Sequence, residues 1–116
     1  VLKGVEEKEM ENHSHFMVKI YTKENNSYFR KGEYEKVLNF FQKKKVIWST
    51  VTKGLVGYGK DRVIHKQGIF SLSEQMPIVI ECIVPSKYLK DLLKELKIII
   101  TEGAIFTTPV DMIMNK

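Results

Sequence analysis

Residues 77–100 read PIVIECIVPSKYLKDLLKELKIII, and this stretch decides the fold. Residues 78, 80, 82 and 84 are apolar at every second position, which predicts a strand with one face in the core. Leucines and isoleucines then recur at a spacing of three and four, which predicts an amphipathic helix. We expect Ser86 to cap this helix at its start and Gly103 to be its C-cap.

The same kinds of pattern occur on either side of this stretch. HFMVKIYT alternates between apolar and polar residues, and the segment from residue 33 to residue 45 has helical spacing. Pro109 marks an edge strand or a bend near the end of the chain. The further expected elements are strands at residues 15–22, 46–53 and 104–114, a helix at residues 33–45, and a short strand and turn within residues 68–76.

This order of elements predicts an α+β protein with a ferredoxin-like βαββαβ arrangement. Two β-α-β halves form one antiparallel sheet, with both helices on one face and the other face bare. Val79 and Ile83 lie on the bare face and would expose apolar side chains in a monomer. We therefore expect another subunit or a partner to cover that face.

Length and composition limit the class of protein. The chain has 116 residues, of which 43% are hydrophobic and 28% charged, as expected for one globular domain, here residues 16–116. Residues 1–15 are expected to form a mobile tail. The single cysteine, Cys82, is expected to be a buried apolar residue, and the protein is expected to occupy a reducing compartment. No apolar run reaches the ~18 residues of a membrane span, and no signal peptide precedes the fold, so we expect a soluble, cytoplasmic protein.

A net charge of +5 favours anionic partners, which include phosphorylated metabolites, nucleic acid and anionic membranes. The glycine-rich stretch KGLVGYGKDRVIHK, residues 53–66, is the candidate site. It begins like a phosphate-binding P-loop, but Asp61 stands where that motif needs a serine or threonine, and the following residues are β-like rather than helical. A P-loop is therefore excluded.

The stretch can still bind an anion by other means. Glycines at 54, 57 and 59 allow backbone N–H groups to turn toward a ligand, and Tyr58 can stack on a base. Lys53, Lys60, Arg62 and Lys66 add positive charge. The alternative is a loop that is bent by its glycines and carries solvated lysines.

A resemblance to a known family rests on three features: K-G-L-V-G-Y-G at residues 53–59, the histidine six residues later, and S-L-S-E-Q-M-P-I-V-I-E at residues 71–81. Together they resemble the family called domain of unknown function 190, which is assigned to the PII-like (GlnB-like) superfamily of trimeric signalling proteins. The resemblance covers residues 16–114. It implies a homotrimer packed through bare sheet faces, adenine nucleotides bound in clefts between subunits, and a regulatory role towards an unidentified target protein. It implies no common enzyme activity.

The resemblance also implies where a ligand would bind. Gly54, Gly57, Tyr58 and Gly59 match the start of the ligand-responsive loop, and Lys60 and His65 lie within that loop. The segment from Glu102 through Gly103 matches the one that lines the same cleft from the other side. PII proteins generally carry a phosphate-binding lysine after this glycine, whereas this chain has Ala104. AMP, or at most ADP, is therefore the expected ligand rather than a triphosphate, with no required cofactor.

Three other functions have less support in the sequence. Catalysis has little support, because the sequence contains no nucleophile beside a base and no paired carboxylates at a usable spacing. An RNA-binding ferredoxin-like module would need aromatic residues on the open sheet face, and residues 78–84 contain none. A metal-binding trimer similar to CutA would use His13, His15 or His65 without any neighbouring cysteine. We expect no enzyme activity, no metal and no nucleic acid.

Overall fold

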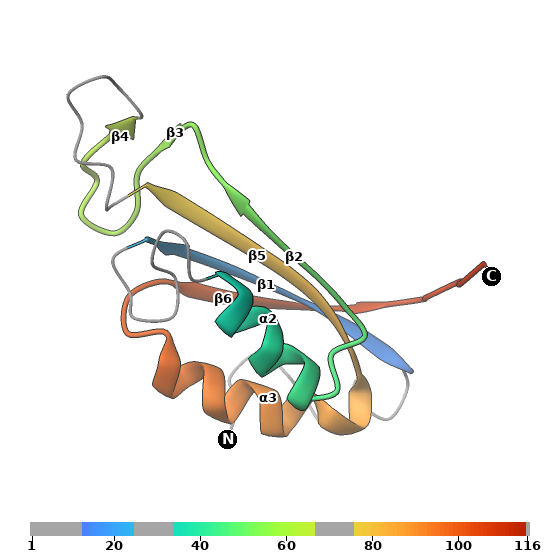
Figure 1. Ribbon diagram of the computed structural model, residues 1–116. Helices are drawn as coiled ribbons and strands as arrows, with labels where there is room; N and C mark the ends of the chain where they lie inside the picture. The colour runs from blue at the N-terminus through green and yellow to red at the C-terminus, as the bar shows by residue number, and fades with distance from the viewer. Residues whose placement is uncertain (1–12, 25–33, 67–75, 116) are drawn as a thin grey trace.

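The computed structural model describes residues 13–24, 34–66 and 76–115, and these form one sheet, two helices and a small hairpin (Figure 1). The elements in chain order are β1 (His15–Lys23), α2 (Tyr34–Lys43), β2 (Trp48–Lys53), β3 (Val56–Gly57), β4 (His65–Lys66), β5 (Pro77–Pro85), α3 (Ser86–Ile99) and β6 (Ala104–Val110).

The four long strands form one sheet in the order β2-β5-β1-β6, in which every neighbouring pair is antiparallel. The central strands β1 and β5 pair along their full length, and Lys19 lies opposite Glu81. β6 is an edge strand, as its proline predicted, because an edge position tolerates the missing N–H of Pro109. This strand order confirms the α+β, ferredoxin-like arrangement.

Both helices cover the same face of the sheet (Figure 1). The alternating pattern places every second residue of β1 and β5 against these helices, while leucines of α3 fill the space between the helix and the sheet. A fully buried side chain of this size stabilises the fold by about 1.5–3 kcal/mol. The core contains Phe16, Val18, Ile20, Val37, Phe41, Ile78, Ile80, Cys82, Val84, Leu89, Leu92, Leu93 and Leu96.

Cys82 is buried and free, as the sequence predicted. Burial raises the pKa of its thiol to about 12, so very little thiolate exists at neutral pH. The residue therefore acts as a small apolar side chain of the core.

Helix α2 ends two residues before the predicted position, in a Schellman motif without a glycine. Val46 N–H donates to the Phe41 carbonyl and Lys45 N–H to the Gln42 carbonyl, with Lys45 at φ 67°. The side chain of Lys44 then joins the two helices, because its ammonium lies 3.2 Å from Asp91 Oδ2 and also pairs with Glu95.

The expected caps of α3 are wrong in both places. Pro85 is the N-cap, and the hydroxyl of Ser86 instead donates to the His13 carbonyl, tying the helix to the segment before β1. At the other end the helix stops at Ile99 with Ile100 as C-cap, because the backbone becomes extended there. Gly103 lies beyond the helix and has a different role, described below.

No helix of the described residues lies on the far face of the sheet (Figure 1). Val79 and Ile83 lie on it as expected. At its centre the ammonium of Lys19 lies 3.4 Å from Oε1 of Glu81. The face also holds aromatic side chains that residues 78–84 do not show. Tyr21 and Phe106 form an edge-to-face pair with ring centroids 5.6 Å apart, and Trp48 is exposed on β2. This set of side chains, called the bare face below, comprises Trp48, Thr50, Thr52, Val79, Glu81, Ile83, Met17, Lys19, Tyr21, Ala104, Phe106 and Thr108.

The described residues include the expected boundary between the N-terminal tail and the domain. β1 begins at His15, and the Ser14 carbonyl accepts a hydrogen bond from Ser86 N–H at 2.9 Å, so hydrogen-bonded structure starts before residue 16. Residues 1–12, most of the expected strand and turn within 68–76, and the expected helix start at 33 lie outside the described residues.

Candidate functional site

A cavity of about 380 Å³ lies where three parts of the chain meet at one end of the sheet. Its walls come from the end of β1, the segment from β3 to β4 together with the first residues of β5, and the turn between α3 and β6. The lining residues are Tyr21, Thr22, Lys23, Gly57, Tyr58, Gly59, Lys60, Asp61, His65, Pro77, Ile78, Glu102, Gly103 and Ala104.

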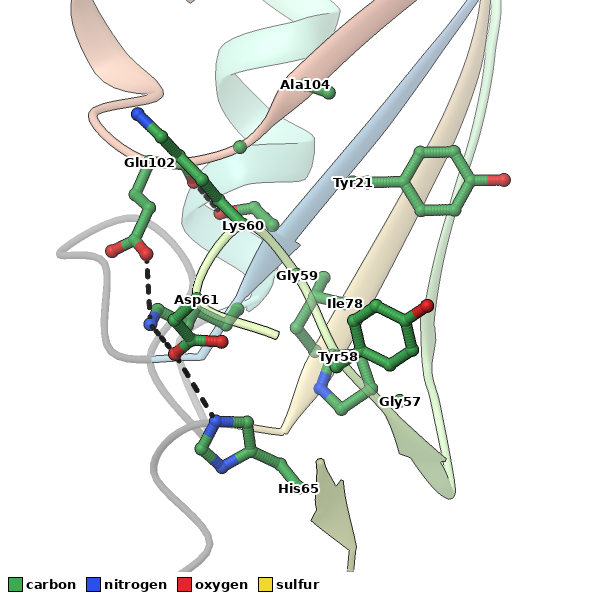
Figure 2. Close-up of a pocket in the computed structure, with 14 residues that line it drawn as sticks. Tyr21, Gly57, Tyr58, Gly59, Lys60, Asp61, His65, Ile78, Glu102 and Ala104 are labelled. Atoms are coloured by element: carbon green, nitrogen blue, oxygen red, sulfur yellow. Dashed lines mark hydrogen bonds and ion pairs between the residues drawn. The ribbon is translucent and has the colours of Figure 1, made fainter. Parts of the chain in front are cut away.

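The cavity has two chemically different sides. Figure 2 shows Lys60, Asp61, Glu102 and His65 on one side and the rings of Tyr21 and Tyr58 on the other. Ile78 is fully buried beneath them, whereas both tyrosine rings are exposed. An exposed aromatic ring beside a charged group suits a ligand with a flat apolar part and an anionic part.

Lys23, the last residue of β1, connects the parts of the charged side. Its ammonium lies 3.1 Å from Glu102 Oε1 and 3.8 Å from Asp61 Oδ2, and its side chain is only 19% exposed. The neighbouring Thr22 hydroxyl donates to the Glu102 carbonyl at 2.9 Å. The end of β1 therefore holds both the hairpin and the α3–β6 turn in place.

Asp61 shapes the turn between β3 and β4. Its Oδ1 accepts a hydrogen bond from Val63 N–H at 3.0 Å, and Arg62 N–H donates to the Gly59 carbonyl at 2.9 Å, with Arg62 at φ 61°. The hydrogen bond from Val63 is the main cause that lowers the pKa of Asp61, and the charges of Lys23 and His65 lower it further. The carboxylate is therefore ionised at neutral pH.

His65, on β4, points its ring towards Asp61 (Figure 2). Its Nε2 lies 3.8 Å from Asp61 Oδ2, which is too far for a hydrogen bond, and this buried nitrogen has no hydrogen-bond partner among the described residues. A buried ring nitrogen without a partner is an uncommon feature that a bound ligand could satisfy.

Gly103 permits the closest backbone approach in the site. It has φ +153°, and a Cβ built there would lie 2.3 Å from the Tyr21 carbonyl oxygen. The glycines of the hairpin differ among themselves. A Cβ at Gly57 would lie 3.2 Å from the Pro77 ring, whereas one at Gly59 would meet nothing within 4 Å.

The cavity brings together most of the residues predicted to bind a ligand. Gly57, Tyr58, Gly59, Lys60, His65 and Gly103 line it. Lys53 and Gly54 do not. The ammonium of Lys53 instead lies 3.2 Å from Oε1 of Glu24, whose side chain is 1% exposed, because a buried carboxylate needs a counter-charge. Gly54 lies against Pro77 and donates its N–H to the Pro77 carbonyl at 2.8 Å.

Sequence reasoning missed the contribution of β1. Tyr21, Thr22 and Lys23 line the cavity because β1 lies between β5 and β6, with Lys23 opposite Pro77 and Tyr21 opposite Ala104. The ferredoxin-like strand order predicted from the sequence contained this information. It places the end of the first strand beside the start of the third long strand and of the last one.

The described residues give no support to a metal site. They contain no group of three or more histidine, cysteine, aspartate or glutamate side chains that could hold a metal ion. His13 packs edge-to-face on Phe16, and His15 Nδ1 lies 2.8 Å from the Ser14 hydroxyl, so neither histidine joins His65. No helix within the described ranges is both long enough and apolar enough to cross a membrane.

The segment from β3 to β4 also confirms that the glycine-rich stretch is not a P-loop. Val56 pairs with Lys66 and Gly57 with His65 in a short antiparallel ladder, where a P-loop would lead into a helix. Gly54, Gly59 and Lys60 have the spacing of a P-loop, but they lead into and form part of a hairpin.

Comparison with solved structures defines the class of fold as PII-like. A structure of CPII, a nitrogen regulatory PII-like protein from Thiomonas intermedia K12, bound to ADP, AMP and bicarbonate, is similar with a TM-score of 0.62 and 15% identity, covering 84% of this chain and 87% of that one. A second structure of CPII, bound to ADP and bicarbonate, has a TM-score of 0.60 at 14% identity over the same shares of the two chains.

The chain belongs to the DUF190 family, described as an uncharacterized ACR, whose model matches residues 15–112. Two UPF0166 proteins are similar along most of their length. The one from Aquifex aeolicus (strain VF5) is 31% identical over 81 residues, which are 70% of this chain and 77% of the relative. The one from Methanocaldococcus jannaschii is 29% identical over 93 residues, which are 79% and 85% of the two chains. The family membership expected from the sequence is thus confirmed.

Proposed function

We propose that this protein is a cytoplasmic, non-enzymatic PII-like regulator that binds a small adenine nucleotide, with AMP preferred, in the cavity at the end of the sheet. The observation that carries the proposal is the division of this cavity. Exposed tyrosine rings line one side, while the hairpin lysine Lys60 lies on the other (Figure 2). An adenine base would stack on Tyr58, and the phosphate would lie near Lys60.

Further support comes from the position of the cavity in the fold. It is formed by the loop after the second long strand and by the turn before the last one, on a fold shared with CPII, a protein solved with ADP and AMP. Tyr21 and Ala104 belong both to the cavity and to the bare face. A homotrimer packed through the bare face would therefore place a neighbouring subunit beside the cavity.

The proposal predicts a specific effect of Lys60→Ala on AMP binding. Lys60 makes no ion pair with any described residue, so its charge is available to a phosphate. Loss of one charge-assisted contact should weaken AMP binding about 10- to 150-fold in isothermal titration calorimetry.

Lys66→Ala is the matched control, because it removes an equal charge from the same hairpin outside the cavity, and AMP should bind to it as to the parent. Lack of AMP binding below millimolar concentration, or equal binding by both variants, would show that the site is assigned wrongly.

A second candidate function is binding of single-stranded RNA on the bare face. Tyr21, Phe106 and Trp48 provide the exposed rings that the sequence of residues 78–84 lacks, and Lys19 lies between them. Such rings stack on unpaired bases. The two functions differ in the state of this face: RNA binding requires it to be open to solvent, whereas a regulator of the proposed kind buries it between subunits.

A further inference from the structure

We propose that Asp61 and Glu102 are specificity-determining residues that select a nucleoside monophosphate and reject di- and triphosphates. This inference rests on the proposed function and deepens it, because it names the residues that decide how many phosphates the cavity accepts. They act by repulsion at the place where a longer phosphate chain would lie.

The charged residues that line the cavity balance one another. The whole chain has a net charge of +5, but the lining residues include two lysines, Lys23 and Lys60, and two acids, Asp61 and Glu102. The charges of these two lysines and two acids cancel. The cavity lining therefore carries no net positive charge. It attracts polyanions less than the net charge of the whole chain suggests.

One of the two lysines, Lys23, already pairs with carboxylates. Lys23 has its ammonium 3.1 Å from Glu102 Oε1 and 3.8 Å from Asp61 Oδ2, and its side chain is largely buried. Its charge is thus offset by two carboxylates. Of the cations lining the cavity, only Lys60 has no carboxylate partner among the described residues, and one lysine matches one phosphate.

The positions of these groups favour a single phosphate. Asp61 and Glu102 lie on the same side of the cavity as Lys60, opposite Tyr21 and Tyr58 (Figure 2). A base stacked on the tyrosines directs its phosphates towards this side. The first phosphate can reach Lys60, but each further phosphate brings negative charge close to two carboxylates. Negative charges that lie close together repel each other, although solvent weakens the repulsion between partly exposed groups.

The two carboxylates also have structural reasons to remain ionised and in place. Asp61 accepts the hydrogen bond from Val63 N–H, which fixes its side chain in the turn, and Glu102 is held by Lys23. The lowered pKa of Asp61 agrees with this arrangement. The two carboxylates that repel further phosphates are therefore in place before any ligand binds.

The test measures the affinities of AMP, ADP and ATP by calorimetry, with EDTA and then with Mg²⁺, for Asp61→Asn, Glu102→Gln and the double variant. With EDTA, each single change should raise the affinity for ATP relative to AMP about three- to fivefold, and the double change about tenfold or more. Asp91→Asn is the matched control: Asp91 also pairs with a lysine, Lys44, at 3.2 Å, but outside the cavity, and its ratio should equal that of the parent.

The outcomes separate this inference from the proposed function. If the parent binds AMP and Lys60→Ala weakens it, but neither carboxylate change alters the ratio of ATP to AMP affinity, the site stands and the selectivity inference is overturned. Glu102→Gln keeps the test valid if Asp61→Asn disturbs the turn. If Mg²⁺ makes ATP bind better than AMP and Asp61→Asn removes this gain, the carboxylates are magnesium ligands, which also overturns the inference.

Discussion

Gly103 joins the fold to the site through a single missing side chain. The backbone of this residue runs so close to β1 that a Cβ would lie 2.3 Å from the Tyr21 carbonyl oxygen, at a φ of +153° that side chains rarely allow. Tyr21 and Gly103 both line the cavity. The close approach therefore sets both the start of β6 and the width of the site.

Gly103→Ala should lower the free energy of unfolding by about 1–3 kcal/mol, because the backbone must move to relieve the contact and the strain. Urea denaturation followed by circular dichroism measures this change. Gly59→Ala is the control: its Cβ meets nothing within 4 Å, so its stability should equal or slightly exceed that of the parent. Equal stability of the two variants would mean that the approach at Gly103 is looser than described.

At the scale of elements, a buried polar cluster holds three ends together. Glu24 follows β1, Tyr34 begins α2 and Lys53 ends β2. The Tyr34 hydroxyl donates to Glu24 Oε2, and the Lys53 ammonium lies 3.2 Å from Oε1. Burial, followed by the hydrogen bond to Glu24 and its charge, raises the pKa of Tyr34, so the phenol stays protonated as a donor. The cluster fixes where α2 starts relative to the sheet.

Lys53→Met should lower the free energy of unfolding by about 2 kcal/mol, less than for a fully buried pair because the lysine is partly exposed. The change leaves the carboxylate of Glu24 buried without its counter-charge. Adding Glu24→Gln should recover part of the loss, which a double-mutant cycle in urea measures. Lys43→Met, on exposed helix surface, is the control and should have little effect. A parent-like stability of Lys53→Met would contradict the structural role and return Lys53 to the candidate ligand-binding residues.

These elements also show what could be predicted from the sequence. The alternation in β1 and β5 and the leucine spacing of α3 are local patterns, and they were sufficient for the strand order and the core. Lys53 was assigned to the ligand because it is a cation beside the glycine-rich stretch, and its actual partner, Glu24, is distant in sequence. The pairing of Lys23 with Glu102 and Asp61 was missed for the same reason. The contacts that decide the role of a charged residue depend on the register of strands, which local patterns do not contain.

At the scale of the whole molecule, the bare face is the main unfinished surface. It carries Val79 and Ile83 together with exposed aromatic rings, and the described part of the chain provides no helix to cover it. A homotrimer packed through this face would bury these side chains and complete the cavity from a neighbouring subunit.

Ile83→Glu should convert such a trimer into monomers, because it places a charge in the buried interface. Light scattering after gel filtration gives the mass directly. Ile98→Glu, on the exposed surface of α3, makes the same change away from the face and should leave the trimer intact. A parent protein with the mass of one chain, 13.5 kDa, would exclude the trimer, and binding of an RNA oligonucleotide by that monomer would favour the second candidate function.

The pairing of β1 with β5 has a consequence for how the chain reaches its native state. Lys19 and Glu81 are neighbours across the centre of the sheet although about 60 residues separate them in sequence. Closing so long a loop costs chain entropy before any contact of the ladder compensates for it, and folding rates fall as contacts become less local. The helix α3, which directly follows β5, can form within microseconds, whereas the central ladder must wait for the first strand to arrive. Kinetic refolding of this protein should therefore be limited by the meeting of its first and third long strands.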